Sequence, residues 1–229
     1  MKLQFTKLEE IICFSADQVV TLQIEDRQLF SRVISSLISE EGEEAIEPYR
    51  FWENDEKKIS PKRAVLVINT LPALPLMDRV LLGKLYEHIS SALEQDIERA
   101  ETSTEISRQL IMDCENLNTM LWGTYSFNTS WSLATFLKAF CFGPSVDQSE
   151  SILDNFISFF GLCADINFNK PLVLVNMKSF FNKNELEALF EQAIFYGIEL
   201  LLLESWNDET QYRYERKLVV DQGFVENWM

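Results

Sequence analysis

One acidic residue of this chain stands where chemistry is common in α/β proteins, at the end of an apolar strand. Residues 200–203 are four leucines, and Glu204 follows them. This pattern is typical of a strand whose terminal carboxylate holds magnesium in nucleotide-hydrolysing proteins. Any buried strand that meets solvent at an acid gives the same pattern, so the structural interpretation stays open beside the catalytic one.

A phosphate-binding loop is missing from the place where one is expected. Residues 64–68 are a continuous apolar, β-branched run, which predicts a central strand covered on both faces. The next seven residues, 69–75, contain no glycine and two prolines, and proline lacks the N–H donor that a phosphate cradle uses. Gly83-Lys84 lies inside an apolar helical pattern, where it is best interpreted as a packed glycine beside an exposed lysine. No nucleotide cofactor is expected.

The nucleophile motifs of hydrolases are also missing. Ser130-Trp-Ser132 lacks the glycines of a nucleophile elbow, and the single histidine, His88, has no nucleophile motif to serve. The four cysteines stand singly among apolar neighbours without a Cys-x-x-Cys pair, which favours reduced core residues. They are Cys13, Cys114, Cys141 and Cys163. We therefore expect a protein that is not an enzyme and that works by binding.

Charged side chains in the middle of the chain offer two weaker signals. Asp113 and Glu115 could supply oxygen ligands to calcium, although they lack the spacing of a calcium loop and solvated helix faces explain them as well. Between Arg108 and Lys170 the only basic residue is Lys138, on a short apolar helix. It is either a solubilising head group or a specific anion contact.

The composition limits the partners. The chain has 229 residues, of which 20 are Lys or Arg and 36 are Asp or Glu, so its net charge is -16. This charge repels nucleic acid and anionic membranes, and a DNA contact would need a local basic patch or bridging cations. No run is apolar enough to span a bilayer, and the N-terminus lacks a secretory signal, so we expect a cytoplasmic protein.

Strand and helix patterns alternate at both ends of the chain, which predicts an α/β fold with a mostly parallel sheet. Residues 19–24 read as a strand, and Asp26 is the expected N-cap of the helix that follows. Residues 172–175 and 198–203 read as buried strands on either side of a helix that Asn182 and Glu185 begin. A strand, a helix and a strand in this order place the two strands parallel.

The middle of the chain is helical. Apolar residues recur at helical spacing over 81–97 and again over 106–121, and the polar residues 101–104 between them predict a turn, so the pair is expected to form a long α-hairpin. Shorter helices are expected over 133–142 and 149–163. The domains predicted are an α/β head of residues 1–75 and 165–229 and a helical leg of residues 76–164.

The order of these segments resembles the Csn2 family, the small spacer-acquisition proteins of type II-A CRISPR systems. The resemblance spans nearly the whole chain and is densest in the first third and from Pro171 onward. The segments that carry it are Phe5-Thr-Lys-Leu-Glu-Glu10, Val20-Thr-Leu-Gln-Ile-Glu-Asp26, Lys62-Arg-Ala-Val-Leu-Val-Ile68, Leu172-Val-Leu-Val-Asn176, Asn184-Glu-Leu-Glu187, Ile198-Glu-Leu-Leu-Leu-Leu-Glu204 and Arg213-Tyr-Glu-Arg216.

The resemblance implies a homotetrameric ring that encircles double-stranded DNA, loads at free ends and acts in spacer acquisition for antiviral defence. It implies a head related to P-loop ATPases without their catalytic residues, and calcium as the ion that holds the ring in its DNA-binding form. It also implies as partners the CRISPR integrase proteins and the effector nuclease of the same locus. A ring can present a few basic residues inward while its outer face stays acidic.

The same resemblance ranks the site residues. Lys138 lies in Phe136-Leu-Lys-Ala139, where the family has a lysine, and is the first candidate for DNA contact, with Arg108 and Arg99 after it. The family's acidic, calcium-related segment corresponds to residues 123–132, where Thr, Ser and Asn replace the carboxylates. Asp113 and Glu115 are then the remaining metal candidates.

Two other functions stay open from the sequence. The first is a degenerate, ATPase-like nucleotide-binding protein that uses Glu204. The second is an acidic adaptor that only assembles the other proteins of the adaptation complex.

Overall fold

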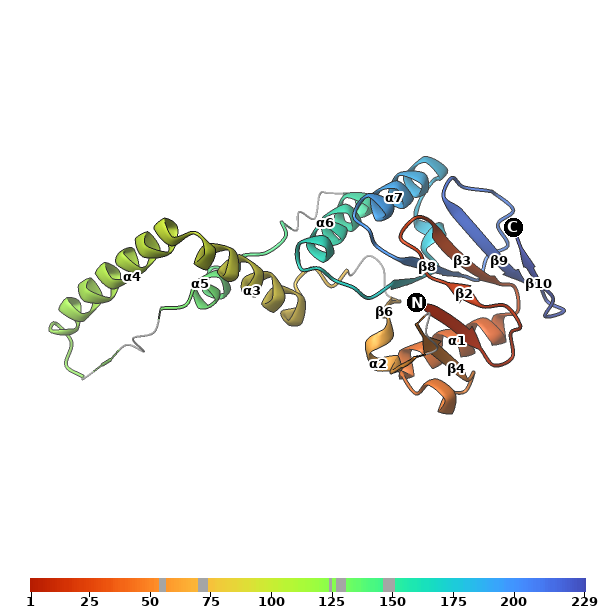
Figure 1. The fold of residues 1–229 in the computed structure, drawn as a ribbon, viewed down its shortest axis with the longest axis horizontal. Helices are drawn as coiled ribbons and strands as arrows, with labels where there is room; N and C mark the ends of the chain where they lie inside the picture. Colours follow the sequence, from red (N-terminus) through yellow and green to blue (C-terminus); the bar gives the residue numbers. More distant parts are fainter. Residues whose placement is uncertain (54–56, 70–73, 124, 127–130, 146–150) are drawn as a thin grey trace. The chain divides into compact units, whose positions relative to one another are not determined.

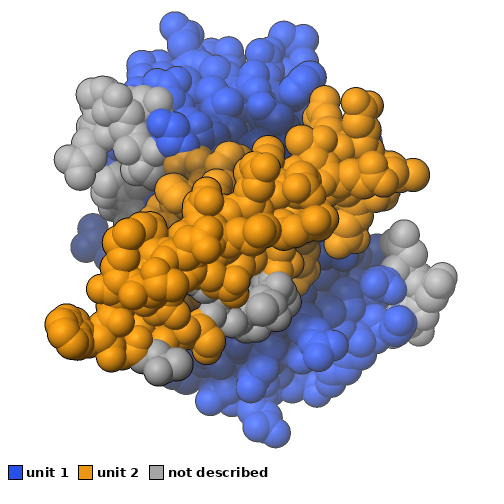
Figure 2. Space-filling view, turned by 90° about the vertical axis from the view of Figure 1, so that its left-hand side faces the viewer, with its two compact units in different colours: residues 1–75, 145–229 blue, residues 76–144 orange. Residues whose placement is uncertain are grey.

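The computed structural model describes the whole chain except residues 54–56, 70–73, 124, 127–130 and 146–150. The chain divides into two compact units, which Figure 2 colours separately. Unit 1 comprises Met1–Pro75 and Ser145–Met229, and unit 2 comprises Leu76–Pro144. The sequence-based division assigns residues 145–164 to the helical leg, whereas this division keeps them with the α/β part.

A six-stranded sheet forms the centre of unit 1, in the order β10-β9-β3-β8-β7-β6. All of its strands are parallel except β10, which pairs antiparallel with β9 at one edge. The predicted α/β fold with a mostly parallel sheet is therefore confirmed. The strands are β3 (Val19–Ile24), β6 (Leu66–Ile68), β7 (Leu172–Val175), β8 (Leu200–Glu204), β9 (Glu215–Val220) and β10 (Glu226–Trp228).

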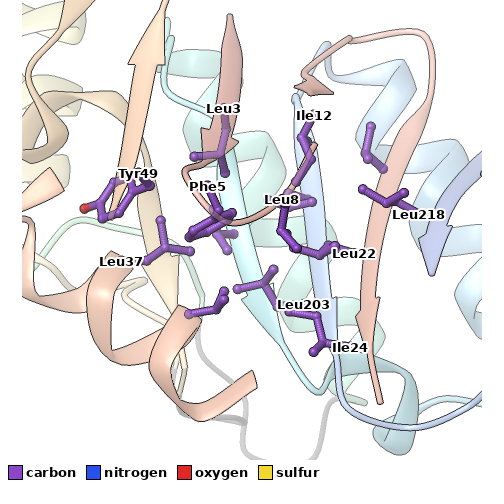
Figure 3. Close-up of a cluster of buried hydrophobic side chains, with 14 of the residues drawn as sticks. Leu3, Phe5, Leu8, Ile12, Leu22, Ile24, Leu37, Tyr49, Leu203 and Leu218 are labelled. Carbon is purple, nitrogen blue, oxygen red and sulfur yellow. The ribbon is translucent and has the colours of Figure 1, made fainter. Parts of the chain in front are cut away.

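One face of this sheet packs against helix α1 (Arg27–Ser39) and a small antiparallel sheet. The small sheet has the order β2-β1-β4-β5, with strands Ile12–Cys13, Lys2–Phe5, Tyr49–Trp52 and Lys58–Ile59. Leu3, Phe5 and Tyr49 of the small sheet belong to the same hydrophobic core as Leu22 and Leu203 of the large sheet (Figure 3). The 3-10 helix η1 (Gly42–Glu44) and helix α2 (Pro61–Ala64) complete this layer.

The opposite face carries helices α6 (Ile152–Asp165) and α7 (Lys183–Phe195), which pack against each other (Figure 1). Side chains alternate along a strand, so residues such as Leu172, Leu174 and Leu202 point to this side and are fully buried. The predicted capping pair is confirmed, because Asn182 and Glu185 form a reciprocal capping box at the start of α7. The 3-10 helix η2 (Met177–Phe180) follows β7.

Unit 2 is helical, with α3 (Arg79–Gln95), α4 (Ile97–Asn118) and α5 (Leu133–Ala139). The turn predicted at residues 101–104 is wrong, because α4 runs through it. The break lies at Asp96, whose side chain accepts the N–H of Arg99 and begins α4. The hydroxyls of Thr102 and Thr104 donate to the carbonyls of Glu98 and Ala100 within the helix instead of capping a new one.

The predicted hairpin of two long helices is also corrected. A single residue separates α3 from α4, whereas an antiparallel return between helices takes about two to five residues. Figure 1 shows α4 leading away from α3, and Ser107 is the one residue of α4 that is buried. None of the described helices is both long enough and apolar enough to cross a membrane.

Candidate functional site

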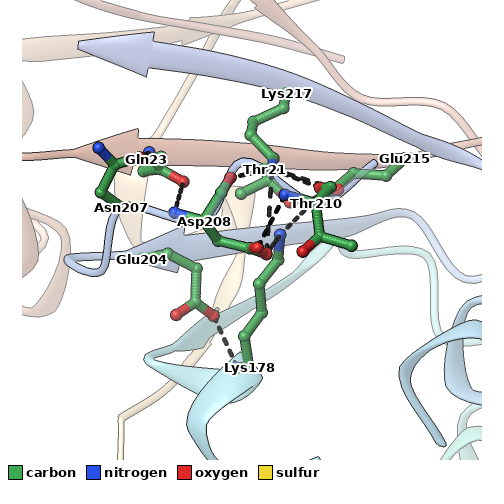
Figure 4. Close-up of polar contacts among 9 residues, drawn as sticks. All are labelled: Thr21, Gln23, Lys178, Glu204, Asn207, Asp208, Thr210, Glu215 and Lys217. Atoms are coloured by element: carbon green, nitrogen blue, oxygen red, sulfur yellow. Dashed lines mark hydrogen bonds and ion pairs between the residues drawn. The ribbon is translucent and has the colours of Figure 1, made fainter. Parts of the chain in front are cut away.

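A cluster of nine polar side chains lies on the α7 side of the large sheet (Figure 4), and most of them are removed from water, although Asn207 and Thr210 are exposed. Thr21 and Gln23 come from β3, Glu204 from the end of β8, and Glu215 and Lys217 from β9. Lys178 comes from η2, and Asn207, Asp208 and Thr210 come from the loop between β8 and β9. We call these nine residues the buried polar cluster. Its members on β3, β8 and β9 alternate with core residues such as Leu22 and Leu218, which is why they share one face.

Lys178 is at the centre of the cluster. Its Nζ lies 2.6 Å from Oε1 of Glu215 and 3.0 Å from Oδ2 of Asp208, and it lies 4.6 Å from the centre of the Tyr212 ring. Burial lowers the pKa of Lys178, but the carboxylates of Glu215 and Asp208 more than offset this effect, so its pKa is raised. Lys178 is therefore a fixed positive charge inside unit 1.

Glu204, the acid at the strand end, is turned toward the chain's own backbone. Its residue is 2% exposed, and its Oε1 accepts the backbone N–H of Lys178 at 3.0 Å. Burial raises its pKa to about 7. This carboxyl can gain or lose a proton near neutral pH, but its position serves η2 rather than a bound metal.

The remaining contacts of the cluster fasten the loop between β8 and β9 onto the sheet. Lys217 donates to the carbonyls of Asp208 and Thr210, and Thr21 donates to the Glu215 carboxylate. Gln23 donates to Asn207 and accepts the backbone N–H of Asp208. Burial alone would raise the pKa of Asp208, but hydrogen bonds from Thr210 and Lys178 lower it to about 2. Lys178 and Lys217 lie among Asp208 and Glu215 here, and these contacts hold the loop between β8 and β9 against the sheet.

At the turn from β3 into α1, a side chain of the protein likewise binds the backbone N–H that a ligand could use. A helix N-terminus after a parallel strand is a common place for a bound phosphate. Here Asp26 Oδ1 accepts the N–H of Leu29 at 2.7 Å. Within the described residues, no group of three or more His, Cys, Asp or Glu side chains is placed to hold a metal ion.

The three predicted DNA contacts all lie in unit 2, and all three are exposed. Arg99 and Arg108 lie nine residues apart on α4, about 180° around the helix, so they point to opposite sides. Each pairs with an acid three residues before it, Asp96 at 3.0 Å and Glu105 at 2.9 Å. Lys138 lies on α5, and no ion pair to it is formed by the residues that the structure describes. The structure does not bring the three side chains into one group.

Asp113 and Glu115 are exposed on α4. Residues two apart on a helix differ by about 200° in direction, so these two carboxylates do not converge on one point. They remain predictions as calcium ligands.

Sequence reasoning does not single out Lys178, Asp208 or Glu215 of the cluster. Lys178 meets Glu204 over 26 positions and Thr21 meets Glu215 over 194, and no spacing in the sequence shows such contacts. The one local signal is the pair of charged residues, Glu215 and Lys217, two apart in a strand whose next residues are buried.

Comparison with known proteins identifies a matching family and a similar solved structure. The family model described as CRISPR-associated protein (Cas_Csn2) matches residues 43–224. Among solved structures, the chain resembles Stu0660 of Streptococcus thermophilus with a TM-score of 0.57 and 14% sequence identity, over 96% of this chain and 74% of that one. This likeness shows a shared fold. No curated protein matches the chain.

Proposed function

This chain belongs to the Csn2 family of CRISPR-associated proteins, and from that premise we propose that it is a non-enzymatic protein that binds double-stranded DNA. In this proposal it acts in spacer acquisition as a homotetrameric ring that loads at free DNA ends. The observation that carries the proposal is the family match over residues 43–224.

Two acidic side chains at strand ends bind the protein's own backbone, which supports a binding role over a catalytic one. Glu204 accepts a backbone N–H of η2, and Asp26 accepts one at the start of α1. Both are positions where a nucleotide-hydrolysing protein would place metal or phosphate. With these groups engaged internally, a sheet of this kind serves as a scaffold.

Self-assembly is supported by the exposed apolar side chains of α4. Ile106, Leu110 and Leu117 are 62%, 59% and 58% exposed. They lie on one face of the helix, because they are four and seven residues apart. Contiguous exposed apolar side chains are typical of protein interaction surfaces. A second copy of the chain is the partner that the proposed ring supplies for this face.

Phosphate contact in the ring is assigned to Lys138, with Arg99 and Arg108 as secondary contacts. Lys138 is exposed and its charge is not cancelled by any described acid, whereas the two arginines are paired within α4. Net charge does not decide such a contact, because the local potential at the phosphate does. The proposal includes calcium as the ion that holds the ring in its DNA-binding form. Its protein partners are the CRISPR integrase proteins and the effector nuclease of the same locus, and it acts in the cytoplasm.

The test compares linear and covalently closed circular duplexes of one sequence over a salt series, with and without calcium. We expect the linear form to bind and the closed circle to bind much more weakly, with affinity that falls steeply as salt rises. Equal binding to both forms, or binding to neither, contradicts the proposal.

A parallel measurement separates this proposal from residual nucleotide binding. Because the Glu204 carboxylate faces the backbone of Lys178, magnesium-ATP is expected to leave the melting temperature unchanged. A rise that grows with ATP concentration would favour the ATPase-like alternative.

A further inference from the structure

The outward face of the small sheet in unit 1 gathers basic side chains around a tryptophan. Lys2 of β1 is the cross-strand partner of Trp52 of β4, and Trp52 is the partner of Lys58 of β5. In the next row Gln4 pairs with Arg50. Cross-strand partners project from the same face of a sheet. We call Lys2, Arg50, Trp52 and Lys58 the basic sheet face.

This face borders a hollow of about 510 Å³ and carries more positive than negative charge. The residues that line the hollow are Lys2, Ile11, Glu43, Arg50, Phe51, Trp52 and Lys58. Among the described residues that line the hollow, Glu43 is the only acid, and it pairs with Lys58 at 2.9 Å. Both partners are more than half exposed, so this ion pair contributes little and can give way to a phosphate. The net charge of the whole chain is -16, so a face with an excess of basic side chains differs from the rest of the molecule.

Two uncharged neighbours fix the direction of the Arg50 guanidinium. Its guanidinium lies 5.0 Å from the centre of the Trp52 ring, and its Nη2 donates to Oε1 of Gln4 at 2.9 Å. Neither partner carries a negative charge, and Arg50 forms no ion pair with any residue that the structure describes, so these contacts do not cancel its charge. A planar guanidinium whose direction is already fixed loses less conformational freedom when it binds a phosphate.

We propose that the basic sheet face contacts the phosphodiester backbone of duplex DNA. Arg50 covers one side of the Trp52 ring, so the ring supports the cation and a base does not stack on that side. Lys2 and Lys58 are two strands apart, about 10 Å, so their long side chains can reach different phosphates of one DNA strand. The contact is independent of DNA sequence.

This inference rests on the proposed function for the identity of its partner and adds a contact in unit 1 to that of Lys138 in unit 2. The test is the salt dependence of linear duplex binding by the full chain. Log affinity falls linearly with log salt, and each phosphate contact contributes about 0.9 to the magnitude of the slope. Removing two contacts should therefore make the slope shallower by about 1.8. The test variant is R50Q/K58Q.

The matched control is R27Q/K183Q, which removes the same charge from exposed residues elsewhere in unit 1. Arg27 lies on α1, and Lys183, like Lys58, is an exposed lysine with an acidic neighbour, Glu187 at 4.0 Å. The control should keep the wild-type slope. Equal slopes for the two double variants, whether lowered or unchanged, overturn the inference.

Two further readouts keep the outcomes separate. K58Q changes one exposed side chain and should lower the slope by about 0.9 even if the double variant folds poorly; an unchanged slope in folded K58Q counts against the inference. A wild-type chain that does not bind linear duplex contradicts the proposed function itself. Wild-type binding with a normal slope in R50Q/K58Q contradicts only the basic sheet face.

Discussion

The ammonium of Lys178 lies 2.6 Å from a carboxylate oxygen of Glu215, and both side chains are almost entirely removed from water, at 7% and 2% exposure. The two residues come from different parts of unit 1, since Lys178 lies after β7 and Glu215 begins β9. Separating two such charges from water is costly unless each stays paired. This pair therefore fixes η2 and the start of β9 relative to each other.

Replacing Lys178 with methionine should destabilise the protein strongly. The variant leaves Glu215 and Asp208 without their closest cation, since Lys217 lies 3.8 Å and 3.9 Å from them. Breaking a buried pair from one side costs about 3–5 kcal/mol. Urea unfolding measures the change in the free energy of unfolding.

Lys183→Met is the matched control for that variant. Lys183 is more than half exposed, and its closest carboxylate oxygen, on Glu187, is 4.0 Å away. Its loss should change the free energy of unfolding by less than about 0.5 kcal/mol. Similar costs for the two variants would show that the buried pair does not stabilise the fold.

Glu204 should make stability fall as pH rises. Burial raises its pKa from 4.5 to about 7, so between these values the folded state holds a proton that the unfolded state has released. The stabilisation is complete below pH 4.5 and is lost as pH rises to 7. At about 1.4 kcal/mol per pH unit, the loss is on the order of 3 kcal/mol.

Glu204→Gln tests this directly. The amide keeps an oxygen that accepts the N–H of Lys178 but does not titrate. The free energy of unfolding of the variant, relative to that of the wild type, should therefore increase between pH 5 and pH 8. Asp208 does not confuse the comparison, because its pKa of about 2 lies below this range. Parallel stability curves for the wild type and the variant would contradict the assignment, and Glu191→Gln at an exposed site is the control.

The local features of the fold were accessible from the sequence. The strand over 19–24 and the Asp26 cap depend on neighbours in the chain, and both were predicted where the structure has them. The break between α3 and α4 was misplaced because Ser and Thr at 102–104 cap helices as readily as Asp96 does, and only the backbone contacts decide which one acts.

Other features depend on partners that the sequence does not reveal. The apolar spacing of α4 was interpreted as the seam of a hairpin, whereas these side chains are exposed in unit 2. Periodicity shows that a face is apolar but does not name what covers it. The buried polar cluster was missed for a related reason, since Lys178 meets Asp208 and Glu215 only after three strands have paired.

Lys138→Glu should weaken binding of linear duplex DNA by about tenfold or more at moderate salt, because it replaces an attractive phosphate contact with a repulsive one. Since Lys138 is exposed, the melting temperature should stay close to that of the wild type. Lys183→Glu applies the same charge change to unit 1. Equal losses for both variants would mean that total charge, rather than the position of Lys138, sets the affinity.

Leu110→Ser together with Leu117→Ser should reduce the mass of the assembly without unfolding the subunit. Both leucines are more than half exposed on α4, so each substitution should change the free energy of unfolding by at most about 0.5 kcal/mol. If a second copy covers this face, however, the variant buries two hydroxyls in an apolar interface and loses the apolar area that stabilised it. Light scattering after gel filtration measures the mass, and Ile46→Ser, at an exposed apolar residue of unit 1, is the control. A wild-type mass for the double variant would exclude α4 as the assembly surface.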